Sequence, residues 1–567
     1  MKRIISVFIC LCLFAAYCAA QDHLRERVYL SSDKEVYVAG DILWCSAYCV
    51  DVNTGRLSSF SGIAYVEIHS AQGLAQTGKI ALYGGRGSGR IDLSNSLPTG
   101  NYRIFAYTAQ SCNEIGYDYL AAAKTVSIFN PLTNDRVGNG VKIVSEEEYA
   151  SRNFFYHRPE GNIRVAAVPD HTGGSASVSI SNDGSETVTL DLSVYHNDGI
   201  VPPHNSGVSD FLSGVRSLPA AAGFRSVRIP EYEGEIIRAK VSGTDADGRD
   251  AVAYKHVFIS APDSRPEPYS ADIDSDGEVS IYTSNIFGNK EMFLEIENPG
   301  EGTVCHLEIE SPFVEPYASS GIPPLEICPS LAGKLEARSM SMQISKAFES
   351  DTLYEHLPIK SPYLFSEEAV RYDLDDYTRF PLMEETIIEF ITELRVGRSG
   401  NRRNIQVLMK DSYNGVYFSE GMSLILVDGV PVFDQEKILS YDPMSVRYVD
   451  IYPYTYFIGK RIFSGVVNFV TYKGSLPGMK FEDNVRIVSF RGAAYPQAYT
   501  GEGISDEYPD YRRTILWHPL VTVAPGETVM LKCKTPAYGG RFEVVVEGMT
   551  GSCLPVYSHT FMELGPR

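Results

Sequence analysis

Short runs that mix apolar and polar positions make up most of the chain. Residues 63–69, 101–108, 176–180 and 541–547 combine Val, Ile, Tyr and Phe with polar residues in this way, and Gly, Asn, Asp or Pro punctuate the runs. β-branched and aromatic residues in short segments between turn residues predict β-strands. Many short strands with frequent turns are typical of β-sandwiches.

One region has the periodicity of a helix instead. Residues 383–394 carry acidic Glu384 and Glu385 in the expected first turn, where the helix dipole favours negative charge. The apolar side chains then follow a helical stripe at Ile387, Ile388, Phe390, Ile391 and Leu394. A second short helix is predicted after Asp434, which is a good N-cap residue. The later part of the chain is therefore predicted to mix α and β.

The first twenty residues have the pattern of a secretory signal peptide. Lys2 and Arg3 form a basic start, an uncharged apolar stretch follows to Ala20, and Gln21 begins a polar stretch. This order predicts export and cleavage after Ala20. Cys18 is the alternative processing point, as the lipid-modified residue of a lipoprotein, but the bulky Tyr17 before it disfavours that outcome.

The charge balance argues against nucleic acid as a partner. The chain has 50 Lys and Arg against 71 Asp and Glu, and removal of Lys2 and Arg3 with the signal peptide leaves 48 basic residues. A strongly acidic protein repels phosphate backbones and anionic lipid surfaces. Beyond the signal peptide, no stretch of the sequence is long and apolar enough to predict a membrane-spanning helix.

Seven cysteines remain after the signal peptide, so at least one is expected to be unpaired. Cys533 and Cys553 lie in one small C-terminal segment and are the pair most expected to form a disulfide. The cysteine spacings do not resemble those of zinc sites.

Residues 28–131 resemble the macroglobulin-type β-sandwich known as the MG2 domain. The resemblance is carried by residues 28–44 (VYLSSDKEVYVAGDILW) and 97–107 (LPTGNYRIFAY). The local chemistry agrees, because Gly40-Asp41 and the Leu97–Gly100 stretch both predict turns between strands. A thioester macroglobulin would also need a Cys-Gly-Glu-Gln stretch, and the sequence contains none.

Residues 402–474 resemble the plug domain of TonB-dependent outer-membrane receptors. The matching segments are 424–432 (LILVDGVPV), 442–451 (DPMSVRYVDI) and 465–474 (GVVNFVTYKG), and Asp428-Gly429 predicts a tight hairpin turn within the first. A receptor needs a long series of barrel strands after its plug, and the 93 residues after Gly474 contain no such series. The resemblance therefore implies a plug-like fold without a barrel.

The order of these segments resembles a group of Bacteroidetes envelope proteins that join an MG2 sandwich to a barrel-less plug. It implies a mostly β chain of tandem macroglobulin- or immunoglobulin-like sandwiches with one α+β plug-like domain. The expected segments are a signal peptide at 1–20, sandwiches at 21–131, 140–260 and 268–345, the helix and plug-like domain at 366–480, and a last sandwich at 505–567.

Asp272, Asp274 and Asp276, with Gly277, match the first half of a calcium-binding loop. The twelfth position is Thr283 rather than the glutamate that closes such a cage, so at best weak calcium binding is expected. An Asp-Gly turn is the ordinary alternative. No cofactor and no firm metal site are predicted.

The sequence offers no recognisable catalytic motif. The glycine-rich residues 84–89 lack the Gly-Lys-Ser/Thr ending of a phosphate-binding loop and are interpreted as a hairpin loop. No His-Glu-x-x-His or Gly-x-Ser-x-Gly segment occurs. His196 and His204 flank an Asn-Asp-Gly-Ile-Val-Pro-Pro loop, where a metal site is the minor alternative.

The leading hypothesis is a non-enzymatic binding or scaffold protein, periplasmic or associated with the outer membrane, whose partner is an envelope protein such as an outer-membrane transport or assembly complex. Phe433, Tyr454 and Phe457 are the candidate partner-binding residues, because exposed aromatics often anchor interfaces. Their alternative role is to fill the core of their own domain. Two rival functions are a macroglobulin-like, non-covalent binder of proteases or peptides, and a hydrolase with a dispersed carboxylate site.

Overall fold

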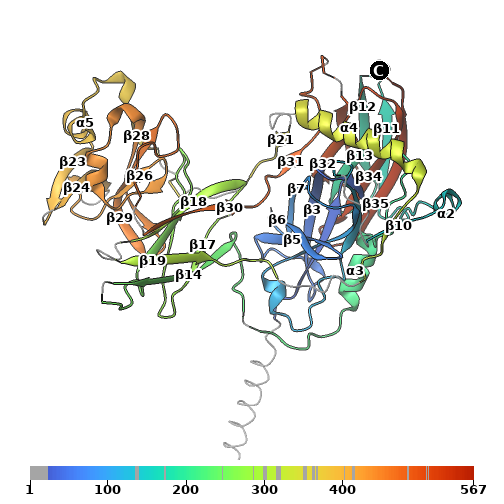
Figure 1. Ribbon diagram of the computed structural model, residues 1–567, viewed down its shortest axis with the longest axis horizontal. Coiled ribbons are helices and arrows are strands. Elements are labelled where there is room, and N and C mark those ends of the chain that lie inside the picture. The colour runs from blue at the N-terminus through green and yellow to red at the C-terminus, as the bar shows by residue number, and fades with distance from the viewer. Residues whose placement is uncertain are drawn as a thin grey trace, which may run out of the picture. The chain divides into compact units, whose positions relative to one another are not determined.

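The computed structural model describes residues 23–133, 140–170, 174–225, 227–245, 247–284, 286–297, 303–314, 321–348, 354–359, 364–365, 368–400, 402–411, 415–481, 484–505, 507–508 and 510–566. The signal peptide expected at 1–20 therefore lies outside the described residues. The fold is mostly β, with many small sheets and few helices (Figure 1). The chain divides into two compact units. Unit 1 comprises Met1–Tyr232, Phe313–Ile359 and Ala493–Arg567. Unit 2 comprises Glu233–Pro312 and Lys360–Gly492.

The first sandwich of unit 1 packs two antiparallel layers around a core of Val, Ile, Leu and Cys side chains. One layer consists of β1 (Glu26–Ser32), β3 (Ile42–Asp51), β4 (Arg56–Leu57) and β7 (Arg86–Asp92). In the other layer, a short parallel pairing of β2 with β9 joins a mainly antiparallel sheet of β2 (Val36–Val38), β9 (Lys124–Phe129), β8 (Gly100–Tyr107), β5 (Ile63–Ser70) and β6 (Gly73–Ala81).

The second sandwich of unit 1 is built from two distant parts of the chain. One sheet has the order β11 (Ile163–Pro169), β12 (Ser175–Asn182), β33 (Thr528–Lys534), and the other has the order β32 (Thr514–Val523), β13 (Val188–His196), β34 (Gly540–Thr550), β35 (Pro555–Leu564). The sequence predicted separate sandwiches at 140–260 and 505–567, whereas their strands alternate in these two sheets. Strands β11, β12 and β13 from the first segment and β32, β33, β34 and β35 from the second bury their apolar faces in one shared core and so form a single sandwich.

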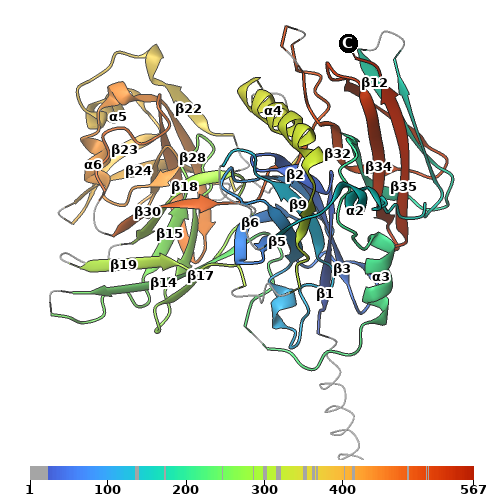
Figure 2. The ribbon, with the colours of Figure 1, turned by 45° about the vertical axis from the view of Figure 1, so that its right-hand side comes forward.

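Helices and short strands cover the outside of unit 1. They include β10 (Val141–Ile143), α2 (Glu146–Ala150), α3 (Val208–Ser217), β20 (Leu325–Ile327), α4 (Ala332–Phe348), β21 (Glu355–His356) and β31 (Gln497–Ala498). Helix α3 packs beside β1 and β35 (Figure 2). The segment 268–345 was predicted to be a sandwich, but most of its last part forms α4. Its Lys, Leu, Glu, Ala, Arg and Met residues favour a helix.

Buried polar side chains join the two sandwiches of unit 1. Asp191 on β13 accepts hydrogen bonds from Ser46 Oγ at 2.7 Å and Tyr48 OH at 3.0 Å, both on β3. Tyr29 on β1 donates to the carboxylate of Glu547 on β34. These bonds satisfy polar groups that would otherwise be costly to bury. They join β3 to β13 and β1 to β34.

Unit 2 contains the third sandwich and the α+β domain. The sandwich consists of a sheet of β17 (Glu278–Tyr282), β14 (Ile236–Thr244) and β19 (Val304–Ile309) and a sheet of β16 (Tyr269–Asp272), β15 (His256–Ser260), β18 (Asn289–Ile296) and β30 (Val485–Arg491). Its strands start well before residue 268, because β14 and β15 belong to its core and not to that of the second sandwich.

The α+β domain has one mixed sheet and one antiparallel sheet around a single core. The mixed sheet has the order β22 (Val370–Asp373), β28 (Val446–Ile458), β29 (Arg461–Thr471), β26 (Leu424–Val427), β27 (Val430–Pro431). The other sheet contains β23 (Leu394–Ser399), β24 (Arg402–Asp411) and β25 (Gly415–Phe418), and α5 (Met383–Phe390) and α6 (Gln435–Leu439) complete the domain.

Local predictions for this domain are confirmed. Helix α5 begins at Met383 with Glu384 and Glu385 in its first turn, although it ends at Phe390, and Leu394 already belongs to β23. The Asp434 carboxylate accepts from Glu436 N at the start of α6. The turn between β26 and β27 has positive φ at both Asp428 and Gly429, as a tight two-residue hairpin requires.

Candidate functional site

The predicted calcium loop is a turn between β16 and β17. Asp274 Oδ1 accepts hydrogen bonds from the backbone N–H groups of Asp276 and Glu278, at 2.9 and 2.8 Å. Asp272 is engaged elsewhere, since it forms an ion pair with Lys460 and its Oδ1 lies 2.6 Å from His256 Nδ1. Within the part of the chain that the structure describes, no three His, Cys, Asp or Glu side chains gather as a metal site. The local bonds account for Asp274 and Gly277 as turn residues.

The three candidate partner-binding aromatics lie in different environments. Phe433 is half-buried, and its ring lies 4.8 Å from that of Phe258, a core residue of unit 2. Tyr454 and Phe457 on β28 are exposed, at 38% and 63%. Phe457 pairs across the hairpin with the exposed Ile462. The structure thus separates a packing residue from two surface residues.

The difference in burial between Phe433 and Phe457 can be tested by substitution. Phe433→Ser should lower the free energy of unfolding of unit 2 by about 2–4 kcal/mol, since truncation of a packed aromatic removes buried apolar contacts. Phe457→Ser should change it by less than about 0.5 kcal/mol, as expected for an exposed position. Urea unfolding followed by far-UV circular dichroism measures both. Equal destabilisation by the two variants would contradict the assignment.

The predicted disulfide is absent. Cys533 and Cys553 are free thiols, and each is buried in a different apolar cluster of unit 1. Their closeness in sequence does not bring them together, because β34 runs between them and carries Cys553 to the far end of the sheet.

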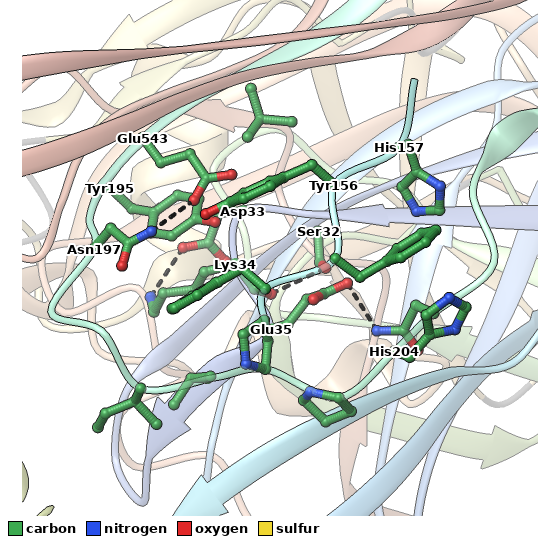
Figure 3. Close-up of a pocket in the computed structure, with 18 of the residues that line it drawn as sticks. Ser32, Asp33, Lys34, Glu35, Tyr156, His157, Tyr195, Asn197, His204 and Glu543 are labelled. Carbon is green, nitrogen blue, oxygen red and sulfur yellow. Dashed lines mark hydrogen bonds and ion pairs between the residues drawn. The ribbon is translucent and has the colours of Figure 1, made fainter. Parts of the chain in front are cut away.

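A cavity in unit 1 has a volume of about 350 Å³. Its floor is the sheet face that carries Glu543, Val545 and Glu547 of β34. These three alternate positions share one side of the strand. The link from β1 to β2 contributes Asp33, Lys34 and Glu35, as Figure 3 shows. Residues 153–157 after α2 and residues from 195–206, at the end of β13 and in the loop before α3, also line it, together with Lys124, Arg338 and Tyr557.

Several charges in this cavity are neutralised locally. Lys124 Nζ lies 3.2 Å from Glu547 Oε2, and Lys34 Nζ lies 2.9 Å from Asp33 Oδ2. Arg338 forms two hydrogen bonds to Asp198, at 2.7 and 2.9 Å. Arg513, outside the lining, binds the same carboxylate. Charge pairing of this kind compensates the cost of burial.

Glu35 and Glu543 differ from these carboxylates because their hydrogen-bond donors are neutral side chains. Asn205 Nδ2 donates to Glu35 Oε1 at 2.7 Å, and Asn197 Nδ2 donates to Glu543 Oε2 at 3.1 Å (Figure 3). In the described ranges neither carboxylate forms an ion pair. Glu543 is only 4% exposed. Both carboxyl groups therefore accept their hydrogen bonds from neutral amide side chains.

Burial sets the protonation of this cavity. It raises the pKa of Glu35 to about 7, with Glu547 and Glu543 adding to the rise and Lys124 and Asn205 opposing it. Burial also raises the pKa of Glu543. Burial alone would raise the pKa of Glu547 too, but Lys124 and the Tyr29 hydroxyl hold it below its ordinary value.

Aromatic rings of residues 154–156 line the cavity beside its floor, where Tyr156 packs on His559 and Phe561 of β35. The rings of Phe154 and Tyr156 are nearly parallel at 5.9 Å, and Tyr156 also stacks on His559. Phe155 lies 4.1 Å from His204. A cavity lined by both carboxylates and aromatic rings favours a positively charged organic group.

Sequence reasoning identified only part of this cavity. His196 and His204 both line it, as ends of the loop singled out for its Asn-Asp-Gly-Ile-Val-Pro-Pro segment. Burial, with Arg513 nearby, lowers the pKa of His196 to about 4, which makes it neutral at pH 7. Glu35 and Glu543 were not predicted. The available signal was a pair of glutamates, Glu543 and Glu547, separated by three valines, which places both on one side of a strand.

No helix among the described residues is both long and apolar enough to cross a bilayer.

No known protein-family model and no curated protein matches the chain. Among solved structures it is similar to Salmonella alpha-2-macroglobulin reacted with methylamine, at 9% identity, with 95% of this chain and 39% of that one covered and a TM-score of 0.24. It is also similar to trypsin-activated alpha-2-macroglobulin from Escherichia coli, at 8% identity, 96% and 42% coverage and a TM-score of 0.23. The Yersinia pseudotuberculosis adhesin InvE matches at 9% identity, 51% and 60% coverage and a TM-score of 0.14.

The chain thus spans about two fifths of the length of the macroglobulins it matches. At these TM-scores the likenesses assign neither a family nor an activity.

Proposed function

We propose that the chain is a non-enzymatic binding or scaffold protein of the bacterial cell envelope, periplasmic or associated with the outer membrane. Its ligand enters the unit 1 cavity and is held without covalent capture. The observation that carries this proposal is the cavity itself, where Glu543 is buried beside neutral partners. Ionising a buried carboxyl group whose hydrogen-bond donor is neutral is costly in the free protein, and a bound cationic ligand lowers that cost.

The signal-like residues 1–20 support the cellular address. The exposed Tyr454 and Phe457 in unit 2 support a separate contact with a partner protein, such as an outer-membrane transport or assembly complex. In this proposal the sandwiches act as rigid carriers of the cavity and of the aromatic surface.

Photocrosslinking tests whether the cavity is occupied. Val545 lines the cavity floor between the two glutamates, and Met530 on β33 is exposed in the same sandwich. We expect a benzophenone amino acid at position 545, in the cells that make the protein, to capture a ligand that the same group at position 530 does not. Mass spectrometry identifies the adduct. Identical adducts at both positions, or none at 545, would contradict a ligand site here.

A hydrolase remains the second candidate function because of Glu35. A carboxyl group with a pKa near 7 has the proton affinity that a general acid needs at neutral pH. This function requires turnover of a peptide or glycoside substrate that Glu35→Gln abolishes. Binding without turnover favours the first proposal.

A further inference from the structure

The unit 1 cavity has more negative than positive charge. Its lining contains five carboxylates, of Asp33, Glu35, Asp198, Glu543 and Glu547, but three basic groups, of Lys34, Lys124 and Arg338. Arg513 reaches Asp198 from outside the lining and removes part of this excess. The remaining excess of carboxyl groups consists of Glu35 and Glu543, whose hydrogen-bond donors are neutral side chains.

We propose that this cavity binds the guanidinium group of arginine, presented by a basic peptide or as the free amino acid, between Glu35, Glu543 and the aromatic wall of Phe154, Phe155 and Tyr156. The inference rests on the proposed function, because it assumes that the cavity takes a ligand. It adds the chemical class of that ligand.

The chemistry and the size of the cavity favour guanidinium over a metal ion or an anion. Its planar N–H groups can donate to two carboxylates at once, and its faces stack on aromatic rings. The volume of about 350 Å³ accommodates one long side chain. A divalent metal would need a tighter set of ligands than the described side chains provide. An anion would meet Glu35 and Glu543 directly.

Binding should be linked to proton release. Six groups face Glu35: Lys124 from β9, Glu543 and Glu547 from β34, and the phenols of Tyr29, Tyr195 and Tyr557. His157 and His204 also line the cavity, and burial lowers the pKa of His157, which leaves it neutral. A bound cation favours ionised Glu35 and therefore releases its proton. Affinity should rise between pH 6 and pH 8 and level off above that range.

Calorimetry on the full chain with two matched peptides tests the inference. The probes are capped Gly-Arg-Gly and the same peptide with citrulline, whose urea group has nearly the shape of guanidinium without its charge. We expect the arginine peptide to bind at least about thirtyfold more tightly than the citrulline peptide, because charge-assisted hydrogen bonds are lost. Buffers with different ionisation heats measure the released proton. Free arginine, as a third probe, distinguishes a peptide ligand from the amino acid.

Protein variants locate the binding. Glu35→Gln and Glu543→Gln keep the side-chain shape and should each weaken the arginine peptide about tenfold or more. Glu563→Gln on β35, outside the cavity and exposed, should leave affinity unchanged. Equal binding of the arginine and citrulline peptides overturns the inference, as does unchanged affinity in both cavity variants or no binding at millimolar peptide. If position 545 still captures a ligand in any of these cases, the proposed function stands and only the ligand class fails.

Discussion

Asp33→Ala should lower the free energy of unfolding of unit 1 by about 3–5 kcal/mol, because it leaves the ammonium of Lys34 buried without its carboxylate. Asp33 is 1% exposed, and Lys34 Nζ lies 2.9 Å from its Oδ2. The same carboxylate also accepts from Tyr37 OH at 2.8 Å, Thr514 Oγ1 at 2.7 Å and Trp44 N at 3.2 Å. Removal of this carboxylate therefore affects both sandwiches of unit 1, since Asp33 follows β1 of the first sandwich and Thr514 begins β32 of the second.

Intrinsic fluorescence isolates this effect. The two tryptophans of the chain, Trp44 and Trp517, both belong to unit 1, so their emission during urea unfolding reports on that unit. Asp92→Ala is the matched control, because Asp92 is exposed at the end of β7 in the same sandwich. It should shift the free energy of unfolding by no more than about 0.5 kcal/mol. Equal transitions for the two variants would show that the Asp33 cluster does not stabilise unit 1.

The features that sequence reasoning predicted correctly are local ones. The Asp428-Gly429 turn, the start of α5 at Met383 and the Asp434 cap each depend on side chains within a few residues. Turn and cap preferences arise from short-range hydrogen bonds and backbone sterics. A sequence read in short windows contains that information.

The second sandwich depends on information that is not local. β12 pairs with β33, and β13 lies between β32 and β34, although more than 300 residues separate the partners. Each strand has an ordinary strand pattern, so nothing in the pattern states which partner completes the sheet. Strand partners are chosen by the packing of whole faces. The prediction of two separate sandwiches followed from reading neighbours in sequence as neighbours in space.

The candidate cavity was not predicted because it too depends on residues that are distant in sequence. Glu35, Glu543 and the aromatic loop at 153–157 come from three parts of the chain. Taken alone, a glutamate on a strand predicts a solvent-facing position, since charged residues are seldom buried. Only the assembled pair of sandwiches brings both carboxyl groups and the aromatic residues to one cavity.

Asp428→Ala should destabilise unit 2 by about 3–5 kcal/mol, through the buried donors that it leaves without an acceptor. Asp428 is 1% exposed. Its carboxylate accepts from Thr471 N and Thr471 Oγ1, both at 2.7 Å, and from Leu476 N at 2.9 Å. An unsatisfied buried donor costs about 1–3 kcal/mol. Alanine also fits poorly at the φ of 48° that this turn position requires.

Asp428→Asn separates the effect of the lost hydrogen bonds from the effect of backbone strain. Asparagine tolerates positive φ at least as well as aspartate, so this variant should avoid the backbone strain but keep only part of the hydrogen bonding. Its stability should lie between those of the wild type and Asp428→Ala. Asp442→Ala is the control: its side chain caps one short turn by accepting from Met444 N at 2.9 Å, and its loss should cost about 1 kcal/mol. Far-UV circular dichroism in urea follows unit 2 together with unit 1, while tryptophan fluorescence follows unit 1 alone. We expect Asp428→Ala to move the dichroism transition and leave the fluorescence transition in place. If fluorescence shifts equally, or if Asp428→Ala behaves like Asp442→Ala, the carboxylate is not what holds this hairpin against β29.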